Sequence, residues 1–200
     1  MYTYLALGDS YTIGELVPLK ENFPHQLVEL LHTEKIEVAA PVIVAKTGWT
    51  TDELAMAIRE EGIKETFSFV TLLIGVNNQY RGREVENYRE EFTNLLNQAI
   101  VFANGHTQHV FVVSIPDWGV TPFAEGKDRE SIAQQIDAYN AVNKEISLAH
   151  RVNWLDITDS TRINAPDATF LAEDGLHPSG KEYRVWAKRL VPMVEKSLRG

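Results

Sequence analysis

Residues 2–14 of the chain are YTYLALGDSYTIG, a short apolar run, Tyr2–Leu7, followed by a segment with turn-forming residues, Gly8–Gly14. A run of this length that contains aromatic residues and ends in Gly and Asp is typical of a buried β-strand. A helical apolar periodicity begins further along the chain at Phe23. The stretch therefore predicts the first strand of a fold in which strands and helices alternate.

The same alternation continues to the end of the chain. Short apolar runs that predict strands buried on both faces recur at Val42–Ala45, Phe69–Ile74, Val110–Ile115 and Val152–Ile157. A capping-box pattern at Thr50–Glu53 predicts a helix start near residue 51, and a second at Ser179–Glu182 predicts one near residue 180. Five strands alternating with helices predict an α/β fold, a three-layer α/β/α sandwich with a five-stranded parallel sheet, in one domain over residues 1–200.

The composition excludes several protein classes. Hydrophobic residues make up 44% of the 200 residues and charged residues 24%, which is ordinary globular usage and argues against a disordered, collagen-like or coiled-coil chain. The absence of cysteine excludes disulfides, thiolate metal sites and a cysteine nucleophile. The formal net charge of −9 argues against nucleic acid and anionic membranes as partners.

The first residues carry no basic segment followed by an apolar one, as a signal peptide would, and no apolar stretch approaches the ~18 residues of a spanning helix. These features favour a cytoplasmic protein with no obligatory membrane partner. A chain from which a leader had been removed would look the same, so a periplasmic or secreted location is the alternative. The sequence makes no prediction of the oligomeric state.

Ligands of open parallel sheets bind beyond the carboxyl ends of the strands, so the segments just after the predicted strands are the candidates for chemistry. Ser10 follows the first strand in a glycine-flanked turn, where a nucleophilic hydroxyl would lie at the sheet edge. Asp174 and His177 lie three apart after the last strand, a spacing at which a carboxylate can orient an imidazole. Taken singly, each is more easily explained as turn or surface-loop chemistry than as part of an active site.

Two more segments supply hydrogen-bond donors. Gly48 follows the second predicted strand, and its backbone N–H can point at a ligand because no side chain covers it. Asn77 follows the third strand, and its side-chain amide can donate to a developing oxyanion. The alternative is a turn glycine before a helix cap and an ordinary loop amide.

Together these segments resemble the four blocks of the GDSL, or SGNH, hydrolases, which supply one Ser, Gly, Asn and His each. The matches are Gly8-Asp9-Ser10 with Gly14, Gly48, Gly75-Val76-Asn77 and Asp174-x-x-His177 with Pro178. They occur in the family's order, each after a predicted strand, and they span nearly the whole chain. The resemblance implies the flavodoxin-like SGNH hydrolase fold.

The resemblance also implies a carboxylic ester hydrolase of the esterase or lipase type. Ser10 would attack the acyl carbon, His177 would act as general base and acid, and Asp174 would orient His177. The N–H groups of Ser10 and Gly48 and the amide of Asn77 would form the oxyanion hole. The family needs neither metal nor organic cofactor. Its substrates are small-molecule esters, among them lysophospholipids, acetylated sugars, aryl esters and thioesters.

The chain departs from the family pattern at one position, because Asn78 stands where the family usually has Asp. Tyr11 stands where Leu is usual, a variation that the family often shows. An asparagine can still accept a hydrogen bond, so the change at Asn78 affects the expected geometry of the loop rather than the oxyanion role of Asn77.

Other residues have two interpretations each. Five aromatic side chains fall in the predicted loops at this edge and either join the core or form an apolar wall for an acyl chain or a sugar face: Trp49, Tyr80, Trp118, Phe123 and Phe170. Trp49, Trp118 and Phe123 are the candidates for substrate contact. Arg81 and Arg83 belong to a solvated loop or receive an anionic group. His106 and His109 are better explained as part of a polar loop than as metal ligands.

Two further functions compete with the esterase. One is an inactive domain of the same fold that binds an acyl or glycan ligand, which loss of Ser10, Asn77 or His177 would indicate, and all three are present. The other is a flavodoxin-like nucleotide or flavin binder, for which Gly8–Gly14 is only a partial phosphate-binding loop.

Overall fold

The computed structural model describes all 200 residues and contains one five-stranded sheet with the strand order β2-β1-β3-β4-β5. All four pairs of neighbouring strands are parallel. The strands are β1 (Tyr4–Asp9), β2 (Val42–Lys46), β3 (Phe69–Leu73), β4 (Val110–Val113) and β5 (Asn153–Leu155). The predicted parallel sheet is confirmed.

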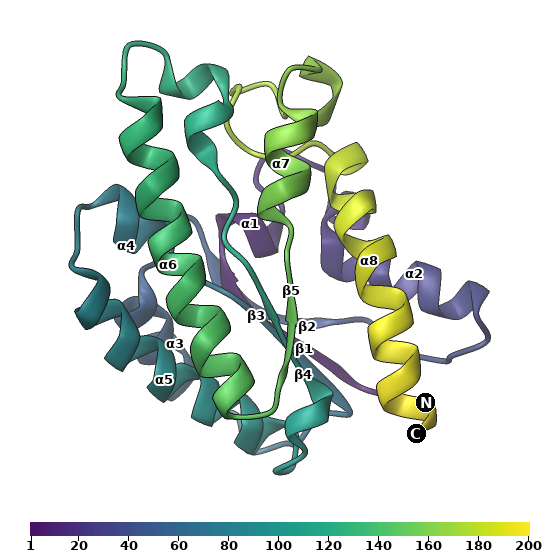
Figure 1. Cartoon of the computed structure of the whole chain (residues 1–200). Coiled ribbons are helices and arrows are strands. Elements are labelled where there is room, and N and C mark those ends of the chain that lie inside the picture. The colour runs from purple at the N-terminus through teal and green to yellow at the C-terminus, as the bar shows by residue number, and fades with distance from the viewer.

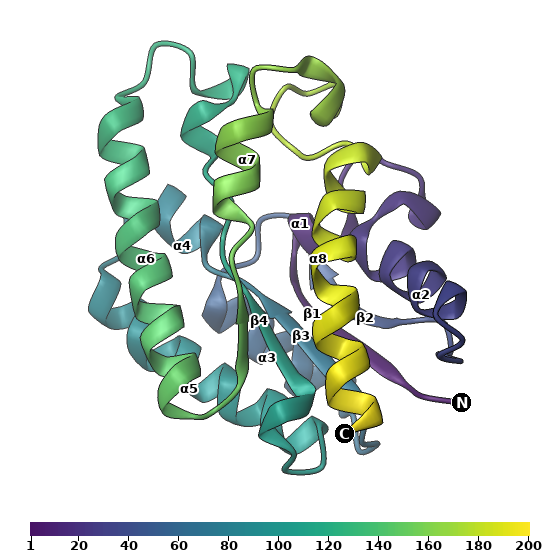
Figure 2. The ribbon, with the colours of Figure 1, turned by 45° about the vertical axis from the view of Figure 1, so that its right-hand side comes forward.

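Helices cover both faces of this sheet, as Figures 1 and 2 show from two directions. One face carries α3 (Thr51–Glu61), α5 (Val85–Phe102) and α6 (Arg129–Ala149), and the other carries α2 (Phe23–Thr33) and α8 (Gly180–Arg199). Three short helices follow strands directly at their carboxyl ends: α1 (Ser10–Ile13), α4 (Val76–Tyr80) and α7 (Thr158–Asn164). The predicted three-layer α/β/α arrangement is confirmed.

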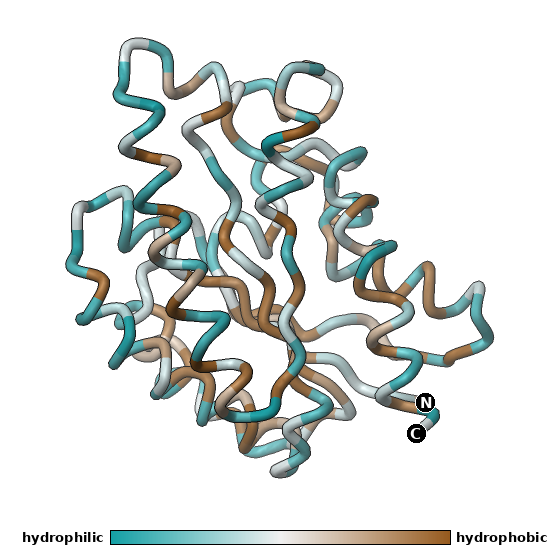
Figure 3. The backbone as a smooth tube through the Cα atoms, in the orientation of Figure 1, coloured by the Kyte–Doolittle hydropathy of each residue, from teal (hydrophilic) through white to brown (hydrophobic).

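The apolar runs become the centre of the core. Every residue of β1, β3 and β4 is buried, and these strands form the brown centre of the tube in Figure 3. Their apolar residues belong to a cluster of 47 buried apolar residues that also includes the inward faces of the helices. Strands covered on both faces bury every side chain, which explains why their sequences are continuous apolar runs rather than alternating ones.

The prediction of burial on both faces was wrong for the two edge strands. In β2 only Val44 is fully buried, and Val42 is 46% exposed. In β5 all three residues are only partly buried. An edge strand has a neighbour on one side only, and its short apolar run is indistinguishable in sequence from that of a central strand.

The first strand lies two residues later than predicted. β1 begins at Tyr4, and Gly8 and Asp9 continue its ladder to β2, opposite Ala45 and Lys46. Tyr2 forms only an isolated bridge. Ser10 is therefore the first residue after the strand, with no intervening loop.

One of the two predicted capping boxes is present. The box of Thr50 and Glu53 is formed at the start of α3. At α8, Ser179 caps the helix by accepting from the Lys181 N–H at 3.2 Å, but Glu182 does not complete a box. Its carboxylate is buried and accepts hydrogen bonds from Ser160, Asn164 and Trp186. Tertiary partners thus take up a side chain whose spacing indicates a local cap.

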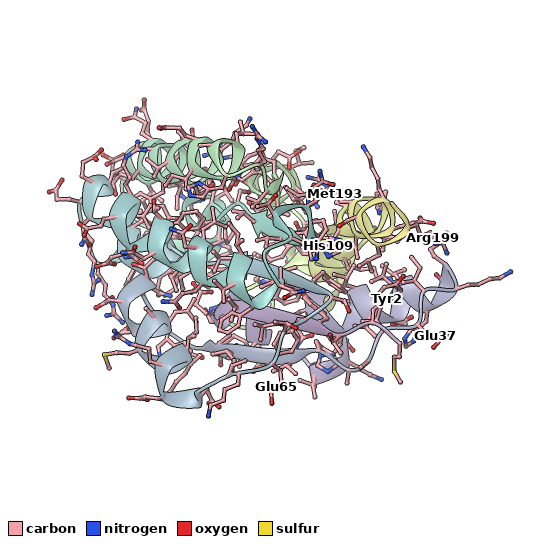
Figure 4. All side chains as sticks on the ribbon, turned by 90° about the horizontal axis from the view of Figure 1, so that it is seen from below. Tyr2, Glu37, Glu65, His109, Met193 and Arg199 are labelled. Atoms are coloured by element: carbon pink, nitrogen blue, oxygen red, sulfur yellow. The ribbon has the colours of Figure 1, made fainter.

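Figure 4 views the molecule from the end that holds the amino-terminal ends of the strands, where His109 is labelled. His109 ends a 3₁₀ turn, Thr107–His109, just before β4, and its ring lies 5.1 Å from that of His106. No group of three or more His, Asp or Glu side chains in the molecule is arranged to hold a metal ion. A separate question is whether any helix could cross a membrane. No helix of the structure is both long enough and apolar enough to do so.

Candidate active site

Ser10 begins α1 at the carboxyl end of β1 and is almost completely buried. Asp9 caps this short helix: its Oδ1 accepts from the Tyr11 N–H at 3.0 Å. Gly8 is required because a Cβ there would lie 2.6 Å from the Leu73 carbonyl oxygen of the neighbouring strand. The Gly-Asp-Ser sequence therefore places the serine hydroxyl directly at the sheet edge.

Two side chains from the loop before α8 form a hydrogen-bonded series with this hydroxyl. His177 Nε2 lies 3.0 Å from Ser10 Oγ, and His177 Nδ1 lies 2.6 Å from Asp174 Oδ2. The other oxygen of Asp174 accepts from the backbone N–H groups of Leu176 and His177, both at 3.0 Å. An ionised carboxylate can only accept hydrogen bonds, so His177 Nδ1 carries the proton and donates to Asp174. His177 Nε2 is then unprotonated and can accept the proton of the serine hydroxyl.

The hydrogen bonds also decide the charge of Asp174. Burial by itself would raise the pKa of Asp174, but donation from the His177 ring and from the N–H groups of Leu176 and His177 outweighs burial and lowers the pKa. The carboxylate therefore stays ionised around neutral pH, as a partner for an imidazolium must.

Gly48 and Asn77 line the same pocket as Ser10 and His177. Gly48 has φ +83°, and its N–H has no hydrogen-bond partner within the chain. The side-chain nitrogen of Asn77 donates to the Trp49 carbonyl at 3.0 Å and lies 3.4 Å from Asp9 Oδ2. The contact with Asp9 is long for a hydrogen bond. The N–H that makes it can therefore donate instead to a substrate oxygen that binds closer in the pocket.

One pocket of about 190 Å³ collects these groups. Its lining comprises Ser10, Tyr11, Thr47, Gly48, Val76, Asn77, Tyr80, Trp118, Phe123, Leu176 and His177. Of the three aromatic residues predicted to contact the substrate, Trp118 and Phe123 line the pocket, and their ring centroids are 6.0 Å apart. The indole of Trp49 is not part of the lining, and Trp49 contributes its backbone carbonyl instead.

Asp9 lies beneath the pocket and is completely buried. Burial raises the pKa of Asp9 to about 7, although hydrogen bonds from the Tyr11 N–H and from Asn77 act in the opposite direction. Its side chain contacts the serine turn and the Asn77 amide, so it supports both.

The substitution at Asn78 has a structural explanation. The buried side chain accepts from the Thr51 N–H at 3.1 Å and donates to the Thr51 hydroxyl at 2.6 Å. That hydroxyl in turn donates to Glu91. An aspartate at this position would need the same hydroxyl proton that Glu91 takes, so Asn78 and Glu91 fit together. Neither Thr51 nor Glu91 is marked by any local pattern in the sequence.

This network predicts the effect of restoring the family residue. Asn78→Asp should lower the free energy of unfolding by about 1–3 kcal/mol, because it removes a donor and buries a carboxylate that lacks one of its hydrogen bonds. Adding Glu91→Gln should restore most of the loss, because the glutamine amide can donate to the Thr51 hydroxyl oxygen and leave the hydroxyl proton to the new carboxylate. Urea denaturation of both variants measures this, and an Asn78→Asp variant as stable as the wild type would contradict it.

A comparison with models of known protein families found a match over most of the chain. Residues 6–185 match the model of the GDSL-like lipase/acylhydrolase family. The chain belongs to this family. The suspected relationship to the GDSL hydrolases is confirmed, and family and fold together support ester hydrolysis as the general reaction. A comparison with curated protein sequences gave no match.

Several solved structures share the fold at low sequence identity. A lipase/acylhydrolase from Enterococcus faecalis has a TM-score of 0.78 at 20% identity, covering 98% of this chain and 96% of its own. TesA has a TM-score of 0.77 at 16% identity, covering 98% and 99%. The acetylxylan esterase Axe2 from Geobacillus stearothermophilus has 0.76 at 18%, covering 96% and 94%.

Proposed function

We propose that this protein is a serine esterase that hydrolyses small carboxylic esters. The observation that carries the proposal is the continuous hydrogen-bonded series from Ser10 Oγ to His177 Nε2, 3.0 Å, and from His177 Nδ1 to Asp174, 2.6 Å. A hydroxyl next to an imidazole that a carboxylate orients is the arrangement by which a weak nucleophile is activated.

In the acylation step, Ser10 Oγ attacks the carbonyl carbon of the ester and its proton passes to His177 Nε2. The carbonyl oxygen becomes negative, and the N–H groups of Ser10 and Gly48 and the amide of Asn77 donate to it. The tetrahedral intermediate then expels the alcohol, which takes the proton from His177 Nε2. The acyl group remains as an ester of Ser10.

Deacylation repeats these steps with water as the nucleophile. Water attacks the acyl carbon and gives one proton to His177 Nε2, and the same three donors hold the second oxyanion. When the intermediate breaks down, the acid leaves and Ser10 Oγ takes the proton back from His177. Asp174 stabilises the imidazolium in both halves without accepting its proton.

The walls of the pocket favour an ester with an apolar acyl group. Tyr80, Trp118 and Phe123 are in mutual contact, with ring centroids 5.3 to 6.3 Å apart. Tyr80 and Phe123 are 51% and 41% exposed, so they offer apolar surface to a substrate rather than to the core. The names of two similar structures, a lipase/acylhydrolase and an acetylxylan esterase, are compatible with this substrate class.

Hydrolysis of p-nitrophenyl acetate, butyrate and octanoate tests the proposal. We expect turnover, with kcat/KM rising up to about fourfold per added methylene while the chain remains within the pocket, since each buried CH₂ is worth ~0.8 kcal/mol. Phe123→Ala should reduce this rise. Phe67→Ala is the control, because Phe67 precedes β3 at the opposite end of the sheet and does not line this pocket. Folded protein that hydrolyses none of the three esters would contradict the proposal, and a rate that does not depend on chain length would contradict the acyl wall.

A further inference from the structure

Arg81 contacts two of the residues proposed to form the oxyanion hole, Gly48 and Asn77. It follows the last residue of α4, and its backbone N–H donates to the Asn77 carbonyl at 3.0 Å. Its guanidinium donates to the Gly48 carbonyl at 2.7 Å. Asn77 and Gly48 are 29 positions apart in the chain, and Arg81 links their two carbonyls in addition to the hydrogen bond from the Asn77 amide to the Trp49 carbonyl.

We propose that Arg81 is a positioning residue that holds Gly48 and Asn77 in the orientation needed to stabilise the oxyanion. This inference rests on the serine-esterase function proposed above. It concerns how two donors that have no rigid element in common keep a fixed relative position.

Gly48 needs such support because the bond from Arg81 is the only hydrogen bond that its own backbone makes. A glycine with φ +83° can rotate its flanking peptides more freely than any other residue. Around the position that a Cβ would occupy, the guanidinium of Arg81, 3.8 Å away, is the only group within 4 Å apart from the adjoining residues. Anchoring the Gly48 carbonyl therefore restrains the loop that carries the Gly48 N–H.

The guanidinium is itself held in place by α3. Its other terminal nitrogen pairs with Glu53 Oε1 at 3.3 Å. Glu53 is fixed in turn because its second oxygen accepts from the Thr50 N–H at 2.9 Å in the capping box. The planar fork of arginine can serve a carbonyl and a carboxylate at once, which a lysine cannot do with the same geometry.

The expected sizes of the two effects distinguish a positioning role of Arg81 from a contribution to folding stability. The Arg81 and Glu53 side chains are 44% and 37% exposed, and a pair this exposed contributes at most about 1 kcal/mol to folding. Misplacing a group of the active site by about 1 Å can reduce the rate 10²-fold. Loss of Arg81 should consequently leave the fold intact and affect the transition state.

Arg83 provides a matched control in the same loop. Its guanidinium pairs with Asp52 at 2.6 Å and with Glu91 at 3.7 Å, and it makes no hydrogen bond to Gly48 or Asn77. Arg83→Met removes the same charge and the same kind of surface ion pair as Arg81→Met does. The two variants differ in that only Arg81→Met loses the hydrogen bond to the Gly48 carbonyl.

The kinetic experiment compares Arg81→Met, Arg81→Lys and Arg83→Met on p-nitrophenyl butyrate. Arg81→Met should lower kcat about 10- to 100-fold with KM within about twofold, because the lost interaction matters only in the transition state. Arg81→Lys should recover part of the loss. Arg83→Met should keep kcat within about threefold of the wild type. Phenylboronic acid, which forms a tetrahedral adduct with an active-site serine, should bind more weakly to Arg81→Met, whereas binding of butyrate should not change.

A second readout does not depend on turnover. In ¹⁵N NMR spectra, the Gly48 backbone amide and the Asn77 side-chain amide should shift or broaden in Arg81→Met and stay unchanged in Arg83→Met. Equal kinetic losses in both arginine variants, or unchanged NMR signals in Arg81→Met, would overturn the inference. A wild type without esterase activity would instead contradict the proposed function, and the NMR comparison would still decide whether Arg81 positions the two donors.

Discussion

Replacing Ser10 with alanine should lower kcat/KM for p-nitrophenyl esters by about 10⁴-fold or more, because the hydroxyl is the nucleophile and the triad acts as a unit. The variant retains the pocket and the donors for the oxyanion, so the remaining rate should be the small acceleration that these groups give to attack by water. The Ser10 side chain is small and buried, so its truncation should leave the fold unchanged.

Ser147→Ala is a suitable control for this experiment. Ser147 is also a buried serine, but it lies in α6 and its hydroxyl donates to the Asn143 carbonyl at 2.6 Å. Its variant should keep full activity. A p-nitrophenyl alkylphosphonate should add its phosphonyl group to the peptide that contains Ser10 in the wild type and not in Ser10→Ala. A pure, folded Ser10→Ala protein with more than about one hundredth of the wild-type activity would rule out the mechanism.

Replacing Asn77 with alanine should lower kcat by about 10²- to 10³-fold, the usual effect of removing one oxyanion donor. KM should change little, because the amide interacts with the oxyanion rather than with the neutral carbonyl of the bound ester. The same change leaves Asp9 Oδ2 and the Trp49 carbonyl without a donor, so the free energy of unfolding should also fall, by about 1–3 kcal/mol.

Asn77→Asp separates the loss of the hydrogen-bond donor from the loss of side-chain volume. Aspartate has the size of asparagine but no N–H, so it fails as a donor even where it fits the space, and its charge repels the oxyanion. Its kcat should be at least as low as that of Asn77→Ala in initial-rate assays with p-nitrophenyl butyrate. A change confined to KM in either variant would show that Asn77 binds the substrate and does not stabilise the transition state.

Much of the candidate site could be predicted from the sequence because each of its parts depends on local chemistry. Gly8 and Asp9 shape the serine turn through contacts within a few residues and with the adjacent strand. Asp174 reaches His177 across a loop only three residues long. The four blocks converge because the carboxyl ends of parallel strands share one edge of the sheet.

The errors have a common origin in contacts between distant segments. Glu182 has the spacing of a capping residue but is buried against Ser160 and Asn164. Trp49 was a candidate for substrate contact; its indole is partly buried against the core, and its carbonyl accepts from Asn77. A side chain that has both a local and a distant option takes the one that satisfies more buried groups.

From sequence alone, the order of apolar runs is enough for the α/β class, and the motif residues are enough for the family, because periodicity and turn chemistry act over a few positions. Two features depended on the folded chain. One is which strands lie at the edges, and the other is the link from Arg81 to Gly48 across 33 positions. Both depend on which segments pack together, and the free energy of that packing is a property of the whole core rather than of any short stretch.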